Sequence, residues 1–479
     1  MQPLSLPALL SLVLVACATT PPTQPAAARP GNLHLDTVEV SVKRHPDSAP
    51  TRQATRVLPA ALIAQQPADP VDVWGGTLTA PVQAATGFFQ VRKLGKRWWL
   101  IDPAGQPFIH AAVADTRPAP SPAAKAAFAQ QWPSTEDWAT QTASWLRDQG
   151  FNGVGAWSDT GALGRASLRV PQTRIVNFMS DYAKSLGRTH VVPGHTGYLN
   201  DAIPVFDPGF AAFATQYAQR LVREADNPAI IGWFSDNEMP LEERTLENFL
   251  KLPESDPNGL AVRHWLAERQ KRPVPERSAI TQADRQAWVG YVYETYARIV
   301  SSAIREADPH HLYLGSRFHG GELRNPQVFA AAGKYLDVIS INYYRTWTPD
   351  PTLMRNWAEW SGRPVLITEW YAKGEDSGLA NTTGAGWVVP TQTARGQFYQ
   401  HFALGLLESG VVVGWHWFKY LDNDPEDPNA EPSNRDANKG LLDIRYRPYA
   451  PLVGAARDFN LRKYALAHAL DSTGDSATR

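Results

Sequence analysis

Residues 229–238 read AIIGWFSDNE, so six mostly apolar residues run directly into four polar ones. Residues 364–371 read PVLITEWY and repeat the pattern, with a carboxylate again ending an apolar run. Short apolar runs bounded in this way are typical of buried strands, above all those of parallel sheets. Glu238 and Glu369 are therefore predicted to stand at the carboxyl ends of two buried strands.

Six further apolar runs of similar length lie in the chain, and helical patterns separate most of them. A strand followed by a helix, repeated about eight times, predicts a parallel sheet with helical crossovers, and eight such units close a (β/α)8 TIM barrel. A doubly wound sheet is the alternative, but no glycine-rich phosphate-binding turn follows the first expected strand. The expected strands are 108–113, 153–157, 174–178, 230–234, 312–315, 338–343, 365–368 and 411–417. The helical patterns are 138–148, 210–225, 283–307, 351–360 and 393–409.

The barrel domain is expected over residues 87–465, with an insertion at 240–281 after the fourth strand. Residues 31–86 contain a weakly alternating apolar stretch at 33–42 and a run rich in proline and alanine. These features predict accessory strands and a linker. The fold class expected for the chain is α/β, a (β/α)8 TIM barrel with a short β-rich N-terminal extension.

The first residues indicate export. Residues 4–15 are mostly apolar and lead into Cys17, which resembles the lipobox of a bacterial lipoprotein signal. This run is too short to span a bilayer, for which about 20 residues are needed. We expect residues 1–16 to be a signal peptide, Cys17 to be lipidated, and residues 17–30 to be a tether, giving a lipoprotein anchored in the outer membrane and facing the periplasm or the cell surface. The alternative is an ordinary secretory leader with an incidental cysteine, since residues 2–10 hold no lysine or arginine.

The composition excludes several classes of protein. The 479 residues include 46 lysines and arginines and 47 aspartates and glutamates, for a formal net charge of −1. A balance so close to neutral argues against a protein that coats nucleic acid. The single cysteine excludes an intramolecular disulfide and a cysteine-ligated zinc or iron–sulfur site. No metal or organic cofactor is implied, and the oligomeric state stays open.

Two carboxylates at the same end of one barrel can face each other across its mouth. Hydrolysis of a glycosidic bond needs such a pair, because one acid must protonate the leaving oxygen while the other attacks the anomeric carbon or activates water. Each residue also has a structural alternative. Ser235 and Glu238 match a capping box for a helix over about 241–252, and Glu369 could be a partly buried carboxylate bonded to loop amides.

Asn237 and Glu238 after the fourth strand, with Glu369 after the seventh, resemble the catalytic residues of clan A retaining glycoside hydrolases. The resemblance implies that Glu238 is the acid/base, that Glu369 is the nucleophile, and that Asn237 binds the sugar hydroxyl next to the reacting carbon. More narrowly, the sequence resembles the family 50 β-agarases and their relatives. The segments that carry this narrower resemblance are 95–108, 150–159 and 232–238.

Further residues at the expected strand ends fit the same plan. In related enzymes a tyrosine after the sixth strand hydrogen-bonds the nucleophile, and Tyr344 is preferred over Tyr343 because it shares a face with Asn342. Aromatic side chains after the second, seventh and eighth strands are candidates for contact with the sugar, with packing in the barrel as the competing interpretation. Arg317 and His319, after the fifth strand, could bind hydroxyls or order a carboxylate. The substrate-binding candidates are Asn237, Asn342, Tyr344, Trp157, Trp370, Trp415, Trp417, Arg317 and His319.

Together these features predict a retaining glycoside hydrolase that cleaves β-glycosidic bonds of a poly- or oligosaccharide, with an agarose-type galactan as the leading substrate. The alternatives are a β-galactosidase or β-mannan-active hydrolase of the same clan, and a non-catalytic glycan-binding lipoprotein. The acidic run 422–427 lacks the glycine and the closing glutamate of an EF-hand loop. A solvated loop at the cleft rim is therefore favoured there over a calcium site. The adjacent His310 and His311 cannot chelate a metal as an i, i+4 pair does.

Overall fold

The computed structural model describes residues 33–273 and 276–476. The expected signal peptide, Cys17 and the whole of the expected tether lie outside these residues. Eight parallel strands form the central sheet: β6 (His110–Val113), β7 (Gly153–Val154), β8 (Gln172–Val176), β11 (Ile230–Ser235), β12 (Leu312–Gly315), β13 (Ile339–Asn342), β14 (Val365–Glu369) and β17 (Val412–Trp417). Their order is β12-β11-β8-β7-β6-β17-β14-β13. This order follows the chain around a ring, as a right-handed succession of βα units requires.

Phe318 joins the two outer strands of this order and so closes the ring. Its backbone N–H donates to Ser340 O at 2.8 Å, and the N–H of Asn342 donates to Phe318 O at 2.8 Å. The same residue forms a parallel bridge with Ile341 of β13. The prediction of a (β/α)8 TIM barrel is confirmed.

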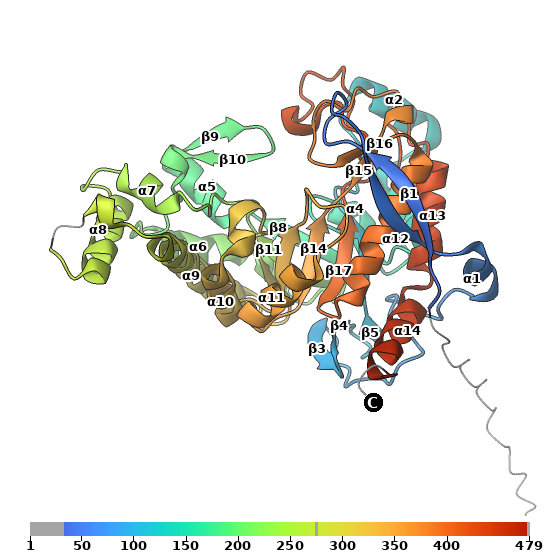
Figure 1. Cartoon of the computed structure of the whole chain (residues 1–479), viewed down its shortest axis with the longest axis horizontal. Helices are drawn as coiled ribbons and strands as arrows, with labels where there is room; N and C mark the ends of the chain where they lie inside the picture. The colour runs from blue at the N-terminus through green and yellow to red at the C-terminus, as the bar shows by residue number, and fades with distance from the viewer. Residues whose placement is uncertain (1–32, 274–275, 477–479) are drawn as a thin grey trace, which may run out of the picture.

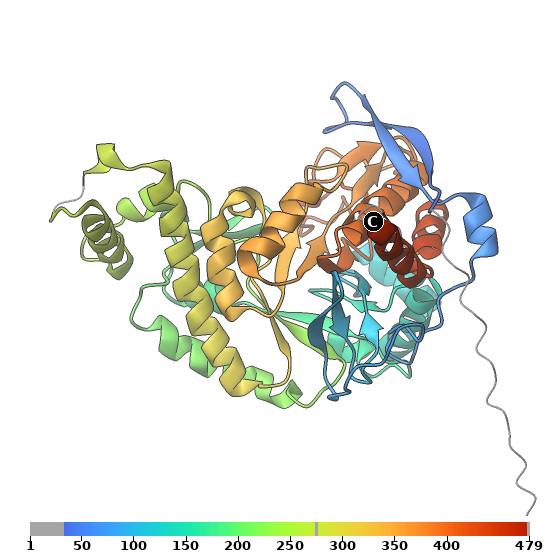
Figure 2. The ribbon, with the colours of Figure 1, turned by 60° about the horizontal axis from the view of Figure 1, so that its bottom comes forward.

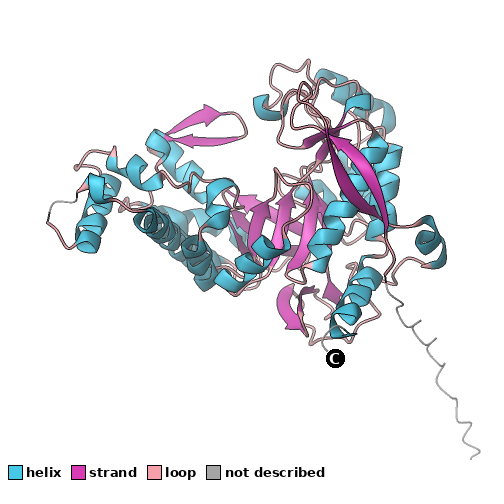
Figure 3. Ribbon diagram, in the orientation of Figure 1, coloured by secondary structure: helices cyan, strands magenta, loops and turns pink. Residues whose placement is uncertain are grey.

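The barrel helices lie outside the strands (Figure 3), and their starts follow from local sequence. Ser134 caps the helix that follows it, and Thr281 and Asp284 form a reciprocal capping box. Asp350 accepts hydrogen bonds from the N–H groups of Thr352 and Leu353. The helices that surround the barrel are α2 (Pro122–Gln131), α3 (Thr135–Asp148), α4 (Thr160–Leu163), α5 (Phe178–Ser185), α6 (Phe210–Ala218), α9 (Gln282–Ala307), α10 (Pro326–Tyr335), α11 (Pro351–Ser361), α12 (Gln392–Glu408), α13 (Ala450–Asn460) and α14 (Lys463–Ser476).

Two expected elements are shorter than their sequence patterns. The helix expected over 210–225 ends at Ala218 and continues as the 3-10 helix η2 (Gln219–Glu224). The strand expected over 153–157 ends at Val154, and Trp157 has a positive φ of 62°, which no strand residue adopts. In both places the side-chain pattern continues although the backbone geometry changes.

The capping box expected at Ser235 and Glu238 is not formed. The hydroxyl of Ser235 lies 2.7 Å from the hydroxyl of Tyr313 and 2.9 Å from that of Tyr296. The next helix, α7 (Thr245–Leu250), begins seven residues after Glu238. The helix-cap interpretation of Glu238 is therefore wrong, and its carboxylate is free for another role.

Several smaller elements are attached to the barrel (Figure 1). The N-terminal hairpin packs on α12, where the N–H of Arg56 donates to His401 Nδ1 at 3.0 Å. The sheet of β3, β4 and β5 lies at the bottom in Figure 1, beside α14, and Figure 2 brings it forward. The attached elements are β1 (Asp36–Val42), β2 (Thr51–Val57), α1 (Ala60–Gln65), β3 (Gln90–Leu94), β4 (Arg97–Ile101), β5 (Pro107–Phe108), α8 (Pro257–Gln270), η3 (Arg277–Ala279), β9 (Thr189–Val192), β10 (His195–Tyr198), η1 (Leu199–Asp201), η4 (Gly320–Arg324), β15 (Ala372–Gly374), η5 (Glu375–Ser377), β16 (Trp387–Val389) and η6 (Pro432–Asn434).

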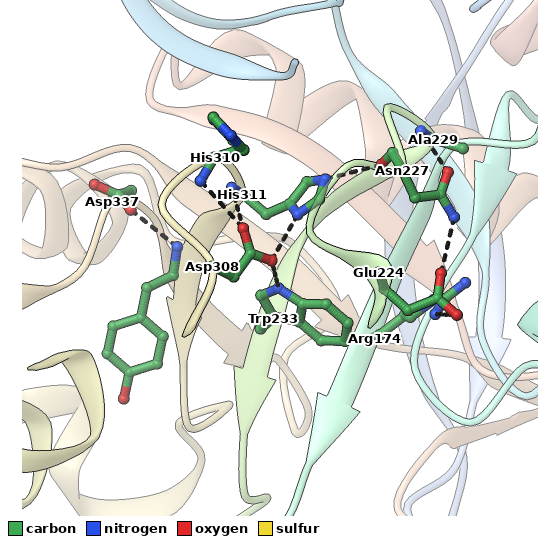
Figure 4. A network of polar contacts seen from close by, with 10 residues as sticks. Arg174, Glu224, Asn227, Ala229, Trp233, Asp308, His310, His311 and Asp337 are labelled. Atoms are coloured by element: carbon green, nitrogen blue, oxygen red, sulfur yellow. Dashed lines mark hydrogen bonds and ion pairs between the residues drawn. The ribbon is translucent and has the colours of Figure 1, made fainter. Parts of the chain in front are cut away.

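A buried polar network ties β11 to the segment before β12 (Figure 4). Asp308 Oδ2 accepts a hydrogen bond from Trp233 Nε1 at 2.6 Å and lies 2.7 Å from His311 Nδ1. The other ring nitrogen of His311 lies 2.8 Å from Asn227 O. Every polar atom of this set has a partner, so the histidine holds the strands in place. In the described part of the chain, no helix is both long and apolar enough to cross a membrane.

Candidate active site

A cleft of about 1090 Å³ opens at the carboxyl ends of the barrel strands. Most of its walls come from the residues that follow β6, β7, β11, β12, β13, β14 and β17, which is where barrel enzymes place their chemistry. The cleft is as large as the largest typical small-molecule pockets. Of the sequence-predicted residues, those that line it are Trp157, Asn237, Glu238, His319, Asn342, Tyr344 and Glu369.

Glu369, the last residue of β14, is held at both carboxylate oxygens. The hydroxyl of Tyr344 donates to Oε2 at 2.7 Å, and Nη2 of Arg317 lies 3.0 Å from Oε1. Arg317 is fully buried and is itself fixed, because it donates to Thr368 O and to Asn237 Oδ1, each at 2.9 Å. The predicted contact of Tyr344 with this carboxylate is thus present, and Arg317 orders the same group.

Burial and charge act in opposite directions on Glu369. Burial raises the pKa of this carboxyl, and the charge of Glu238 adds to the rise. The positive charge of Arg317 and the hydrogen bond from Tyr344 oppose it by stabilising the ionised form. Burial and the neighbouring carboxylate also hold the pKa of Tyr344 well above its usual value, so that its hydroxyl remains a donor.

Glu238 stands on a strained turn at the cleft, where its charge acts on Glu369. Asp236 and Glu238 have positive φ angles of 76° and 49°, conformations that cost energy in residues other than glycine. Asp236 anchors this turn, because its buried carboxylate accepts hydrogen bonds from the N–H groups of Met179 and Ser180 at 2.7 and 2.9 Å. It also accepts a bond from Tyr296 at 2.7 Å.

Asn342 connects the two carboxylates. Its Nδ2 donates to Glu238 Oε1 at 2.8 Å and lies 3.3 Å from Asn237 Oδ1. Its Oδ1 accepts from the hydroxyl of Thr368, the residue before Glu369, at 2.8 Å. A single amide therefore fixes Glu238 in relation to the end of β14.

His319 adds a positive charge beside Glu238. Its Nε2 lies 4.0 Å from Glu238 Oε2, and its Nδ1 lies 3.6 Å from Glu322 Oε1. Burial alone would lower the pKa of this imidazole, but the nearby carboxylate of Glu322 and the charges of Glu238 and Glu242 outweigh it and raise the pKa to about 9. The structure thus places His319 beside a carboxylate, as the sequence led us to expect.

Trp157 forms an aromatic wall of the cleft. The guanidinium carbon of Arg317 lies 4.2 Å from the centre of its ring, and Phe418 meets it edge to face at 5.8 Å. The indole is therefore held at a fixed angle beside the group that orders Glu369.

The expectation that Trp370, Trp415 and Trp417 contact sugar is wrong. All three are buried among the helices outside the barrel. Trp370 stacks on Phe402 of α12 at 4.7 Å, and Trp415 Nε1 donates to the hydroxyl of Tyr399. Both faces of a barrel strand carry apolar side chains, so an alternating pattern cannot tell which face points inward.

The residue between two of these tryptophans points the other way. His416 Nε2 lies 2.9 Å from Nδ1 of His110, and both rings are fully buried inside the barrel. Burial lowers the pKa of His110 to about 3 and holds that of His416 well below its usual value. The two imidazoles are therefore neutral at neutral pH.

Sequence reasoning missed several side chains of the cleft. Asp115 follows β6 and Lys419 follows β17, so the search for polar residues at strand ends, applied to these strands, would have found them. Lys439 lies 22 residues beyond the end of β17, and no local pattern marks it. His195 reaches the cleft on the β9–β10 hairpin, which was not anticipated.

The acidic run 422–427 lies at the cleft wall, but its first residue is not solvated. Asp422 is buried and accepts hydrogen bonds from the N–H groups of Lys439 and Gly440 and from the hydroxyl of Tyr449, at 2.7–2.8 Å. It therefore anchors the loop that carries Lys439. Among residues 33–273 and 276–476, no three histidine, cysteine or acidic side chains are grouped so that they could hold a metal ion.

Comparison with known proteins gives both sequence relatives and a structural neighbour. No family model matches the sequence. The crystal structure of BpGH50 superposes with a TM-score of 0.81 at 32% identity, over 93% of this chain and 99% of that one. The chain belongs to glycoside hydrolase family 50. As a family 50 member it is also similar to β-agarase B and β-agarase A of Vibrio sp. (strain JT0107), at 25% identity over 370 residues and 26% over 396. These matches cover 69% and 72% of this chain, but only 37% and 38% of the length of these two curated relatives.

Proposed function

We propose that this protein is a retaining glycoside hydrolase that cleaves β-glycosidic bonds in a galactan of the agarose type. The observation that carries the proposal is the pair of carboxylates fixed by separate polar side chains, Glu369 by Tyr344 and Arg317, and Glu238 by Asn342. One carboxylate is held by a cation and a hydroxyl, as a nucleophile must be. The other carboxylate, Glu238, is assigned the role of acid and then base.

In the first step an oxygen of Glu369 attacks the anomeric carbon while the bond from that carbon to the leaving oxygen breaks. Glu238 gives its proton to the leaving oxygen, so a glycosyl ester of Glu369 forms and the released sugar is neutral. In the second step water attacks the same carbon, Glu238 takes a proton from the water, and the ester bond to Glu369 breaks. Two inversions at one carbon return the original configuration.

The surroundings of Glu369 favour this cycle. The attacking group must be ionised although it is buried, and the charge of Arg317 supports the ionised form. Once the ester has formed, the negative charge on Glu369 is gone, and Glu238 no longer faces a second carboxylate. That change favours the ionised Glu238 that the second step needs as a base.

The leading substrate rests on the relatives. Two of them are β-agarases, and family 50 is shared with the structural neighbour over nearly the whole chain. The cleft is consistent with a sugar chain, because it has a volume of about 1090 Å³, is lined by both polar and aromatic side chains, and includes Trp157 and Phe418 together with the carboxylates.

A panel of agarose, β-galactosides and β-mannans, with products sized and their anomeric configuration followed by NMR, tests the proposal. We expect hydrolysis of agarose with the β-anomer formed first, and none by Glu369→Ala. An α-anomer formed first would contradict retention. Cleavage of β-galactosides alone would identify a β-galactosidase, and cleavage of mannans alone would identify a β-mannan-active hydrolase. Binding of agarose without any hydrolysis would identify a non-catalytic glycan-binding protein instead.

A further inference from the structure

A group of basic side chains lies in the cleft beside the carboxylate pair. Three of the five lysine and arginine side chains that line the cleft, Arg117, Lys419 and Lys439, gather around the single carboxylate of Asp115. Lys419 Nζ lies 2.7 Å from Asp115 Oδ2, and Arg117 Nε lies 2.6 Å from Oδ1. Both oxygens of that carboxylate are thus occupied, and the group retains an excess of positive charge.

Lys439 is the cation without a carboxylate of its own. Only 1% of the residue is exposed, and its ammonium lies 4.6 Å from the centre of the Phe418 ring. Within the part of the chain that the structure describes, no oxygen accepts a hydrogen bond from Nζ. The carboxylates of Asp115, Glu369 and Glu431 act on this ammonium through charge alone. Burying an ammonium without a hydrogen-bonded partner is costly, so such a group points to a function that uses its charge.

The backbone at Lys439 is fixed firmly. Its N–H donates to Asp422 Oδ1 at 2.8 Å, and its carbonyl accepts hydrogen bonds from Trp417 Nε1 at 2.9 Å and from the N–H of Lys419 at 3.1 Å. Burial, and next the positive charge of Lys419, hold the pKa of the Lys439 side chain well below its usual range. A negative charge placed against the pair would offset that repulsion.

We infer that Lys439, Lys419 and Arg117 form an anion-binding subsite, which takes a negatively charged substituent, a sulfate ester or a carboxylate, on a sugar bound next to the carboxylate pair. The inference rests on the proposed function and adds to it a class of substrate, a galactan with anionic groups. The position follows from Phe418, which contacts both Lys439 and Trp157, the aromatic wall of the cleft.

The first experiment compares three substrates: unmodified agarose, partially sulfated agarose, and agarose in which part of the primary hydroxyls is oxidised to carboxylates. We expect Lys439→Met to lower the ratio of kcat/KM for one charged substrate to that for unmodified agarose at least tenfold, and Arg117→Met to lower it by a smaller factor. Whichever charged substrate responds identifies the anionic group. Arg324→Met is the matched control, because Arg324 also lines the cleft but lies after β12, outside the group around Asp115.

An unchanged ratio in Lys439→Met for both charged substrates would overturn the inference. An equal drop in Arg324→Met would also overturn it, since the effect would then belong to the charge of the whole cleft. Arg117 is more than half exposed, so its variant keeps the test open if the buried Lys439→Met does not fold.

A second measurement separates this inference from the proposed function. Calorimetric titration with inorganic sulfate, at constant ionic strength against chloride, needs no turnover. We expect wild-type protein to bind sulfate and Lys439→Met to bind it at least fivefold more weakly. Absence of hydrolysis on every glycan would contradict the proposed function, whereas wild-type protein that binds no sulfate would contradict the subsite.

Discussion

The hydroxyl of Tyr344 lies 2.7 Å from Oε2 of Glu369, and the backbone N–H of the preceding tyrosine, Tyr343, donates to the carbonyl of Glu369 at 2.9 Å. The end of β13 therefore positions both the side chain and the main chain of the proposed nucleophile. Only Tyr344 contacts the carboxylate with its hydroxyl, because the hydroxyl of Tyr343 accepts a hydrogen bond from Asp350 N at 3.0 Å instead.

Replacement of Tyr344 by phenylalanine should slow turnover and leave the fold intact. The variant loses one hydrogen bond to a charged group, which contributes about 1.5–3 kcal/mol, so kcat should fall roughly ten- to a hundredfold. Steady-state kinetics on agarose, with circular dichroism as the check of folding, measure this. Tyr343→Phe is the matched control and should affect stability more than rate. A large kinetic effect in the control with none in Tyr344→Phe would reverse our assignment of the two tyrosines.

His319 should make stability depend on pH on the alkaline side. Its pKa is raised to about 9 in the folded protein. Its contribution to the free energy of unfolding is therefore complete below the pKa of the unfolded state, near 6.5, and is lost as the pH rises through 9. The side chain is partly exposed, and we expect a loss on the order of 1–2 kcal/mol between pH 7 and 10. Thermal unfolding of His319→Gln should show a smaller decline over this range than wild type, while the exposed His190→Gln should match wild type. Identical pH curves for all three proteins would show that His319 is not charged near pH 7.

The buried pair of His110 and His416 predicts sensitivity to acid. The pKa values of both are lowered by burial, so their contribution to stability is complete above about 6.5 and is lost as the pH falls below it. At pH 5 each histidine that stays neutral in the folded protein lowers the free energy of unfolding by about 2 kcal/mol. The melting temperature of His416→Gln should fall less between pH 7 and 5 than that of wild type, and the exposed His264→Gln serves as control. A slope equal to that of wild type would mean that other groups cause the acid sensitivity.

Lipidation of Cys17 remains a prediction from the sequence. A dual-chain anchor is enough for stable attachment to a membrane. Wild-type protein should therefore sediment with membranes, and Cys17→Ser should move to the soluble fraction with its glycosidase activity unchanged. Wild-type protein found free in the periplasm or the medium would favour the secretory-leader alternative.

The barrel could be predicted from the sequence because its signals are local: an apolar run, a polar residue at its end, and a helix with a capping residue. The same rule found Glu238, Glu369, Asn342 and Tyr344, because the local sequence alone places these residues at strand ends. It failed for Trp415 and Trp417, because their direction depends on barrel closure, which sets the inward face of β17 over a long range.

Side chains from long loops could not be predicted either, because long-range contacts also determine their positions. Lys439 reaches the cleft only because Asp422 anchors its loop, and His195 only because residues 189–198 form a hairpin. Neither contact has a pattern in the neighbouring sequence. The connection from Glu238 through Asn342 to Thr368 likewise joins three strands, so no single segment contains it.

The most direct test of the account replaces each glutamate by alanine and supplies azide. In Glu369→Ala the nucleophile is absent, and azide in the vacated space should attack the anomeric carbon of a substrate with a good leaving group, giving a glycosyl azide of inverted configuration. In Glu238→Ala the glycosyl ester still forms from such a substrate, and azide should intercept it to give the product of retained configuration. Circular dichroism must show that both variants fold. The opposite pairing of products would exchange the two roles, and full activity of either variant on a natural glycan would falsify the two-carboxylate mechanism.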